Sequence, residues 1–181
     1  VPPCGTGWCW YHRGMSRLFG LVASHPVDFS FSLLEAPKNF RALGQNLPDG
    51  WGLGYFAGGR PEVRKSALPA AGEVAPEEGA AAATSDLFLA HVRRGSRAPR
   101  ALRNTHPFAE DGWLFAHTGV LYPLLEAKVR RQAGRARPYQ GQTDSEALFH
   151  LLLLNLEQHP EPMAAIRATV ALLVEDGQFS G

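Results

Sequence analysis

Strand-like apolar runs come first in this sequence, and helix-like periodicity comes later. Short runs of strand length and composition cover residues 16–23, 51–57, 86–93 and 113–117. Short helical patterns at 29–35 and 40–43 interrupt them, and helical spacing dominates from residue 122. A hairpin pattern follows at 174–177. Strands, then helices, then the start of more strands indicate a layered α+β sandwich.

Glycine and proline mark the turns between these segments. The stretch Asn46-Leu-Pro-Asp-Gly50 is typical of a turn, and Gly58-Gly59 predicts a hairpin that leads into residues 61–67. No helix or third glycine follows at the right distance, so these glycines do not form a dinucleotide-binding fingerprint. Residues 70–84 are rich in Ala, Gly and Glu and predict a surface excursion.

Three helices are expected in the last third of the sequence. The first covers residues 122–132, and the third follows Pro160. The second opens at Thr143, with Glu146 three residues later, and runs to about residue 158. That spacing is typical of a capping box, in which Thr143 is the N-cap.

Composition bounds the class of protein. A chain of 181 residues with 45% hydrophobic and 19% charged residues predicts one soluble globular domain. The net charge of +1 favours neither nucleic acid nor a membrane as partner, and no apolar stretch approaches the ~20 residues that span a bilayer. Both cysteines, Cys4 and Cys9, lie near the start, so we expect no disulfide framework, no metal site and a cytoplasmic location.

The first fourteen residues match no periodic pattern, whereas order begins at Met15. Residues 1–14 are therefore interpreted either as a mis-assigned start before an initiator Met15 or as a flexible extension, and both alternatives stay open. The difference matters because removal of Met15 leaves Ser16 with a free α-amine.

Five segments together resemble the glutaminase domain of class II glutamine amidotransferases, from Met15 to about Gly177. They are Met15-Ser-Arg-Leu-Phe-Gly20, Pro48-Asp-Gly-Trp-Gly52, His91-Val-Arg-Arg-Gly-Ser96, Asn104-Thr-His-Pro-Phe with Phe115-Ala-His-Thr-Gly119, and Thr143-Asp-Ser-Glu146. The pattern is most similar to small stand-alone members, including the ergothioneine-pathway type. The resemblance implies the αββα sandwich of N-terminal-nucleophile hydrolases over residues 15–181, expected here to be C-terminally incomplete.

The resemblance also assigns roles to residues. Ser16 matches the nucleophile, whose own α-amine is the general base and titrates near ~7.7–8.0 when unperturbed. Arg93 matches the arginine that holds the glutamine α-carboxylate, and Asp144 matches the acid that holds the α-ammonium. Gly119 offers a backbone N–H to the oxyanion, and Thr118 stands where the family has an asparagine amide.

Further residues are candidates for the substrate pocket. Ser96, Thr105 and His106 are expected to line it. The histidines His91, His106 and His117 could form a metal triad or supply an imidazole base, but framework histidines are the favoured interpretation. Arg93 and Asp144 have ordinary alternatives as well, as a solvated arginine and as an acid that stabilises a helix N-terminus.

The predicted function is an amidohydrolase of glutamine or a γ-glutamyl amide, acting through an acyl-enzyme and without a cofactor. Ser16 in place of cysteine and Thr118 in place of asparagine both weaken this chemistry. The alternative is therefore a catalytically silent homologue that binds a glutamine-like ligand or a partner protein. A synthase partner or a homo-oligomer fits either function, and nucleic-acid binding through the Arg-rich loop is a distant third.

Overall fold

A computed structural model of the chain describes residues 15–37, 39–45, 47–70, 83–95, 97–134, 136–174 and 179–180. Several predictions fall outside this set, namely those on residues 1–14 with Cys4 and Cys9, on Ser96, on most of the surface excursion at 70–84 and on 175–177 of the expected hairpin.

A four-stranded antiparallel sheet forms the base of the molecule, with strand order β1-β4-β2-β3. Its strands are β1 (Arg17–Asp28), β2 (Trp51–Ala57), β3 (Arg60–Ser66) and β4 (Thr84–Val92). All four expected extended segments of this region are confirmed, β2 with its predicted bounds. Gly58 and Gly59, with φ of 57° and 77°, make the predicted β2–β3 hairpin, since paired positive φ values suit a two-residue turn.

Strand β1 is longer than the predicted segment 16–23. It continues past Pro26 to Asp28, with an irregular register between Val22 and Val27. Proline is tolerated because β1 is an edge strand, so its missing N–H removes no bond inside the sheet. The apolar run that predicted the strand simply ended before the strand did.

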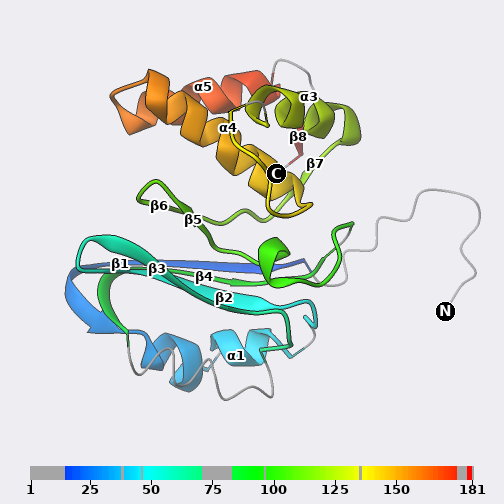
Figure 1. The fold of residues 1–181 in the computed structure, drawn as a ribbon. Helices are drawn as coiled ribbons and strands as arrows, with labels where there is room; N and C mark the ends of the chain where they lie inside the picture. Colours follow the sequence, from blue (N-terminus) through cyan, green and yellow to red (C-terminus); the bar gives the residue numbers. More distant parts are fainter. Residues whose placement is uncertain are drawn as a thin grey trace, which may run out of the picture.

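One face of the sheet is covered by the π-helix η1 (Phe31–Glu35) and by α1 (Phe40–Leu43), as Figure 1 shows. Both lie at the predicted helical segments. Alternate β2 residues, Trp51, Leu53 and Tyr55, point into this core, because successive side chains of a strand face opposite sides. The other β2 positions in that stretch, Gly52 and Gly54, face the layer above.

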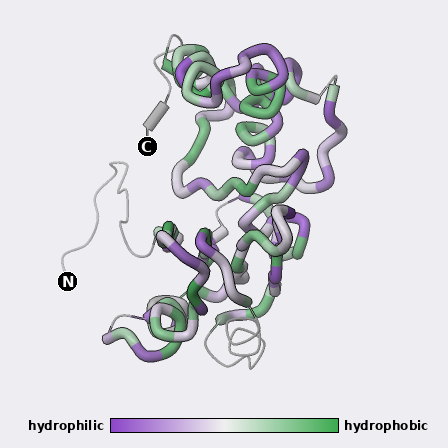
Figure 2. The backbone as a smooth tube through the Cα atoms, turned by 90° about the vertical axis from the view of Figure 1, so that its left-hand side faces the viewer, coloured by the Kyte–Doolittle hydropathy of each residue, from purple (hydrophilic) through white to green (hydrophobic). Residues whose placement is uncertain are grey.

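Above the sheet lie two short two-stranded sheets and a helical layer (Figure 1). Strands β5 (Phe108–Glu110) and β6 (Trp113–Phe115) pair with each other, as do β7 (Val120–Leu121) and β8 (Phe179–Ser180). The helices are α3 (Pro123–Ala133), α4 (Asp144–Gln158) and α5 (Pro162–Val174). Figure 2 shows hydrophobic and hydrophilic stretches alternating along these helices, as expected for helices that pack on one face.

Two details of this upper half differ from the predictions. The expected strand 113–117 ends at Phe115 and pairs with β5. No apolar run in the sequence predicted β5. The turn Asp111-Gly112, with φ of 52° and 82°, is the signal that could have located this strand. Thr143 is the N-cap of α4, as predicted, and accepts a hydrogen bond from Glu146 N–H at 3.1 Å. The Glu146 carboxylate instead accepts from the N–H groups of Gln140 and Gly141.

The layers run helix, four-stranded sheet, short two-stranded sheets, helix, so the predicted α+β sandwich is confirmed. Within the described part of the chain, the helices are too short or too polar to cross a membrane.

Candidate functional site

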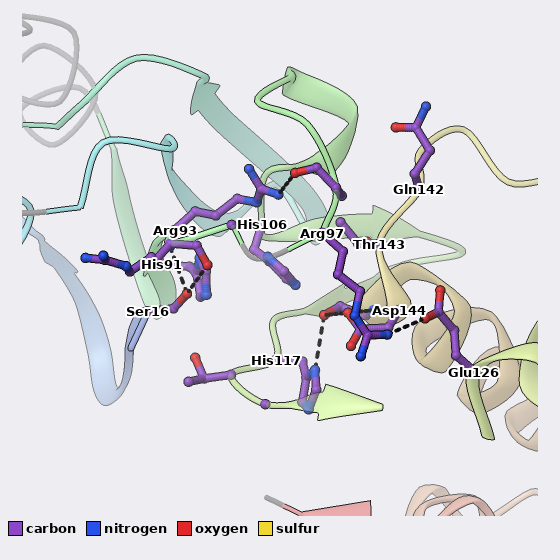
Figure 3. A pocket seen from close by; sticks show the side chains of 16 residues that line it. Ser16, His91, Arg93, Arg97, His106, His117, Glu126, Gln142, Thr143 and Asp144 are labelled. Carbon is purple, nitrogen blue, oxygen red and sulfur yellow. Dashed lines mark hydrogen bonds and ion pairs between the residues drawn. The ribbon is translucent and has the colours of Figure 1, made fainter. Parts of the chain in front are cut away.

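A pocket lies where the ends of β1 and β4 meet the N-terminus of α4 (Figure 3). It lies between the sheet and the helical layer, and charged and polar side chains make up most of its lining. Its lining consists of Ser16, His91, Arg93, Arg94, Gly95, Arg97, Ala98, His106, His117, Thr118, Gly119, Glu126, Gln142, Thr143, Asp144 and Ser145.

Ser16 stands one residue before β1, at the sheet edge of this pocket. Arg17 pairs with Val92 in the antiparallel ladder, so the next position along places Ser16 beside the end of β4. The Ser16 hydroxyl oxygen accepts a hydrogen bond from Arg94 N–H at 3.0 Å. This bond fixes the hydroxyl at the pocket without burying it.

Arg93 is held in one orientation by the loops around it. Its side chain is only 4% exposed, and Nη2 donates to Ala98 O at 2.8 Å. Nη1 points to Asp49 O at 3.4 Å, and a Cβ at Gly95 would lie 2.7 Å from Nη2, so the glycine makes room for the guanidinium. Burial lowers the pKa of Arg93, against the opposing charge of Asp49. A buried, oriented guanidinium is suited to binding a carboxylate.

Asp144 is the first residue of α4, and its carboxylate is anchored by backbone groups. Oδ2 accepts from Leu121 N–H at 2.9 Å, and Oδ1 accepts from Ser145 N–H at 2.8 Å. The carboxylate thus connects β7 to the helix N-terminus, where a negative charge is favoured. Asp144 lines the pocket and also lies in the first turn of α4. A role in ligand binding and a role in stabilising the helix N-terminus are therefore compatible.

The segment 117–119 connects β6 to β7 along the pocket wall. The Thr118 hydroxyl is buried, and it has no hydrogen-bond partner within the described residues. A side chain at position 119 would not fit, because a Cβ there would lie 2.6 Å from His117 Nε2. Thr118 and Gly119 both line the pocket that contains Ser16.

Three neutral histidines form the inner wall of the pocket. The rings of His91 and His106 are 4.4 Å apart, and none of their four nitrogens has a partner among the described residues. Burial is the main cause that lowers the pKa of His91 to about 4 and that of His106 well below its usual range. Burial also lowers the pKa of His117, although Asp144 acts in the opposite direction. All three rings are therefore uncharged at neutral pH.

No metal centre emerges from these histidines. In the ranges that the structure describes, no group of three or more His, Cys, Asp or Glu side chains is arranged to hold a metal ion. The metal-triad interpretation thus has no support here.

The structure brings together most of the residues selected from sequence. Six of the eight line this one pocket: Ser16, Arg93, His106, Thr118, Gly119 and Asp144. Ser96 lies outside the described residues. Thr105 is not part of the lining; its buried hydroxyl donates to Ala101 O at 2.9 Å and stabilises the turn that precedes His106.

Sequence reasoning missed three lining residues that belong to the pocket mouth. Arg97 reaches across to Glu126 on α3, with Nη1 3.4 Å from Oε2, as Figure 3 shows. Gln142 is held by Asn104, which donates to its Oε1 and accepts from its N–H. These contacts join segments 29 and 38 residues apart, so no local pattern in the sequence could reveal them.

Comparison with known proteins gives a consistent picture. The family model "Glutamine amidotransferases class-II" matches residues 15–178. The protein named "Putative glutamine amidotransferase YafJ", from Escherichia coli (strain K12), is 32% identical over 178 residues, which cover 92% of this chain and 67% of that protein. A gamma-glutamyl-hercynylcysteine sulfoxide hydrolase from Mycobacterium tuberculosis (strain CDC 1551 / Oshkosh) is 39% identical over 117 residues, 59% of this chain and 50% of its own.

The fold is shared with a solved structure of the same kind. Glutamine phosphoribosylpyrophosphate amidotransferase from B. subtilis superposes with a TM-score of 0.63 at 18% identity, covering 86% of this chain and 32% of that one. The layered architecture is thus the αββα sandwich of N-terminal-nucleophile hydrolases. With a family match over nearly its whole length, the chain belongs to the class II glutamine amidotransferases.

Proposed function

We propose that this domain hydrolyses the side-chain amide of glutamine or of a γ-glutamyl amide, with Ser16 as nucleophile. The observation that carries the proposal is that Ser16, Arg93, Gly119 and Asp144 line a single pocket. A carboxylate and an ammonium on one carbon would meet Arg93 and Asp144, and the amide would then extend toward Ser16. The relative from Mycobacterium tuberculosis, named as a γ-glutamyl hydrolase, supports this substrate class.

The proposed chemistry proceeds through an ester. The Ser16 hydroxyl attacks the amide carbonyl carbon, and the α-amine of Ser16, once Met15 is removed, takes its proton. The Gly119 N–H, with the unpartnered Thr118 hydroxyl beside it, stabilises the oxyanion. The C–N bond then breaks, ammonia or an amine leaves with the proton, and water hydrolyses the acyl-enzyme.

A second candidate is a silent homologue that binds the ligand without turnover. It is favoured by Ser16, since a hydroxyl is a poorer nucleophile at neutral pH than a partly ionised thiol. Thr118 also favours it, because loss of an oxyanion donor costs ~10²–10³ in rate. Arg93 and Asp144 serve binding in both cases.

Calorimetry with glutamine and glutamate tests the pocket directly. Arg93→Ala and Asp144→Asn should each weaken binding at least about tenfold, because a charge-assisted hydrogen bond contributes ~1.5–3 kcal/mol. The matched controls are Arg60→Ala and Asp86→Asn, exposed positions of the sheet that do not line the pocket. Binding of neither ligand at millimolar concentration by the native protein would count against the whole proposal.

Activity separates the two candidates. Intact-mass measurement of natively produced protein should first show Ser16 as the N-terminal residue. Ser16→Cys combined with Thr118→Asn should then raise ammonia release from glutamine by at least about 10²-fold, given the cost of a missing donor alone. A protein that binds glutamate but remains inert after both substitutions is the silent homologue.

A further inference from the structure

Four of the five sequence segments that carry the family resemblance contribute residues to the pocket lining, but the segment 48–52 does not. Its backbone and the Asp49 carboxylate instead contact the residues that follow β4. From these contacts we infer that Asp49 is a positioning residue, which holds Arg93 in the orientation that binds the α-carboxylate of the ligand. The inference rests on the proposed function for the identity of that ligand.

Asp49 and Gly50 contact the end of β4 and the loop after it at three places. Gly50 O accepts a hydrogen bond from Arg93 N–H at 2.8 Å, and Asp49 O lies 3.4 Å from Arg93 Nη1. Asp49 Oδ2 accepts a hydrogen bond from Gly95 N–H at 2.9 Å. The first two contacts use backbone oxygens, so only the bond to Gly95 depends on the Asp49 side chain.

The backbone of Gly95 is the surface on which the Arg93 guanidinium packs. A Cβ at position 95 would lie 2.7 or 2.8 Å from three guanidinium atoms, Nη2, Cζ and Nη1. Because Asp49 binds the N–H of this same glycine, its carboxylate fixes the backbone against which the guanidinium lies. Arg93 Nη2 also donates to Ala98 O at 2.8 Å, a bond drawn as a dashed line in Figure 3. The guanidinium is therefore held between Gly95 and Ala98.

The Asp49 carboxylate does this without using the charge of Arg93. Its second oxygen, Oδ1, pairs with Arg100 Nη2 at 3.6 Å. Arg93 forms no ion pair within the described part of the chain, and its side-chain hydrogen bonds go to carbonyl oxygens. A direct ion pair with Asp49 would compete with a ligand carboxylate for the same N–H donors. Burial lowers the pKa of Arg93 and the nearby Asp49 charge opposes this effect, so the side chain stays charged at neutral pH.

Two ligands that differ only in the α-carboxylate test the inference. Glutamate carries this group and 4-aminobutanoate lacks it, so the ratio of their dissociation constants measures the contribution of Arg93. For the native protein, NMR titration should give a ratio of at least about ten. Asp49→Ala should reduce the ratio to about three or less, because glutamate binding weakens while 4-aminobutanoate binding changes little.

Further variants separate position from charge. Asp49→Asn keeps an oxygen that can accept from Gly95 N–H, so its ratio should stay within about twofold of native. Asp49→Glu keeps the charge but displaces the carboxylate by one methylene, and it should lower the ratio at least about threefold. This variant provides the test if Asp49→Ala does not fold.

Two controls isolate the bond to Gly95. Arg100→Ala removes only the exposed ion-pair partner of Asp49, and its ratio should remain within about twofold of native. Asp86→Ala makes the same substitution at an exposed position of β4 outside the lining and should behave as native. A loss of the ratio in Arg100→Ala as large as in Asp49→Ala would make the ion pair the operative contact and overturn the inference.

The remaining outcomes also distinguish this inference from the proposed function. A native ratio in folded Asp49→Ala and Asp49→Glu would overturn the positioning role and leave the proposed function intact. Equal weakening of both ligands would mean that Asp49 stabilises the loop in general, which overturns the inference as well. If the native protein binds neither ligand, or binds both equally, Arg93 does not bind an α-carboxylate, and the proposed function fails together with this inference.

Discussion

At Gly52 the loop that carries His106 lies directly against the sheet. A Cβ at this position would lie 2.1 Å from His106 O and 2.9 Å from Pro107 Cδ. On the same face of β2, Leu114 and Pro107 lie against Gly54. Two small residues on one face of β2 therefore set how near the pocket loop lies to His91 on the adjacent strand.

Gly52→Ala should consequently be costly. The new methyl group meets backbone rather than a flexible side chain, so the loop must move, and overpacking of this kind costs about 1–3 kcal/mol or more. Gly20→Ala on β1 is the matched control, because nothing lies within 4 Å of a Cβ there. Urea denaturation should show a loss of at least about 2 kcal/mol for Gly52→Ala and less than about 0.5 kcal/mol for Gly20→Ala. Equal losses would contradict the close approach.

At the scale of elements, the N-terminus of α4 joins three parts of the site. Thr143 caps the helix, Asp144 binds the backbone of β7, and Glu146 accepts hydrogen bonds from the loop at Gln140 and Gly141. Arg130 of α3 donates to Thr143 O at 2.7 Å. Loss of the cap should therefore lower the free energy of unfolding and also change the geometry of the pocket.

Thr143→Ala removes the hydroxyl that accepts from Glu146 N–H, and it should lower the free energy of unfolding by ~0.5–2 kcal/mol. Thr143→Ser keeps the hydroxyl and should stay within about 0.5 kcal/mol of native. Thermal and urea unfolding measure both variants. If serine and alanine destabilise equally, the side-chain cap is not what stabilises this helix end.

At the scale of the whole molecule, the pocket is where the sheet and the helical layer meet around neutral histidines. His91 comes from β4, whereas His117 lies next to α4, and burial depresses the pKa of both. The unfolded chain binds protons at these histidines near pH ~6.5, but the folded protein does not. Stability is therefore complete above about pH 6.5 and declines as the pH falls toward the folded pKa values.

For His91 the window runs from about pH 6.5 down to about 4, and the loss across it is on the order of 3 kcal/mol. His91→Gln should flatten the dependence of unfolding free energy on pH in this range, whatever its effect at pH 7. His25→Gln, exposed on β1, should leave the slope as in the native protein. Parallel curves for native and His91→Gln would mean that folding does not lower the pKa of His91.

The amino-acid sequence by itself determined the features that depend on interactions between residues close together in the chain. The β2 span, the Gly58-Gly59 turn and the Thr143 cap follow from local backbone preferences and from the side chain's reach to the next turn. The spaced motifs likewise identified the family and selected six residues that share one pocket. Their catalytic and binding roles stay predictions.

Only the tertiary structure decided what depends on contacts between distant segments. The Thr105 hydroxyl donates a hydrogen bond to Ala101 O and does not line the pocket, and Arg97 contacts Glu126. His117 is hydrogen-bonded to Ser145, which lies 28 residues later in the chain. The pairing of β5 with β6 likewise escaped the pattern of apolar runs, because each strand is only three residues long. Such contacts arise when layers pack, and their geometry is set by the path of the backbone rather than by the residues beside them in the chain.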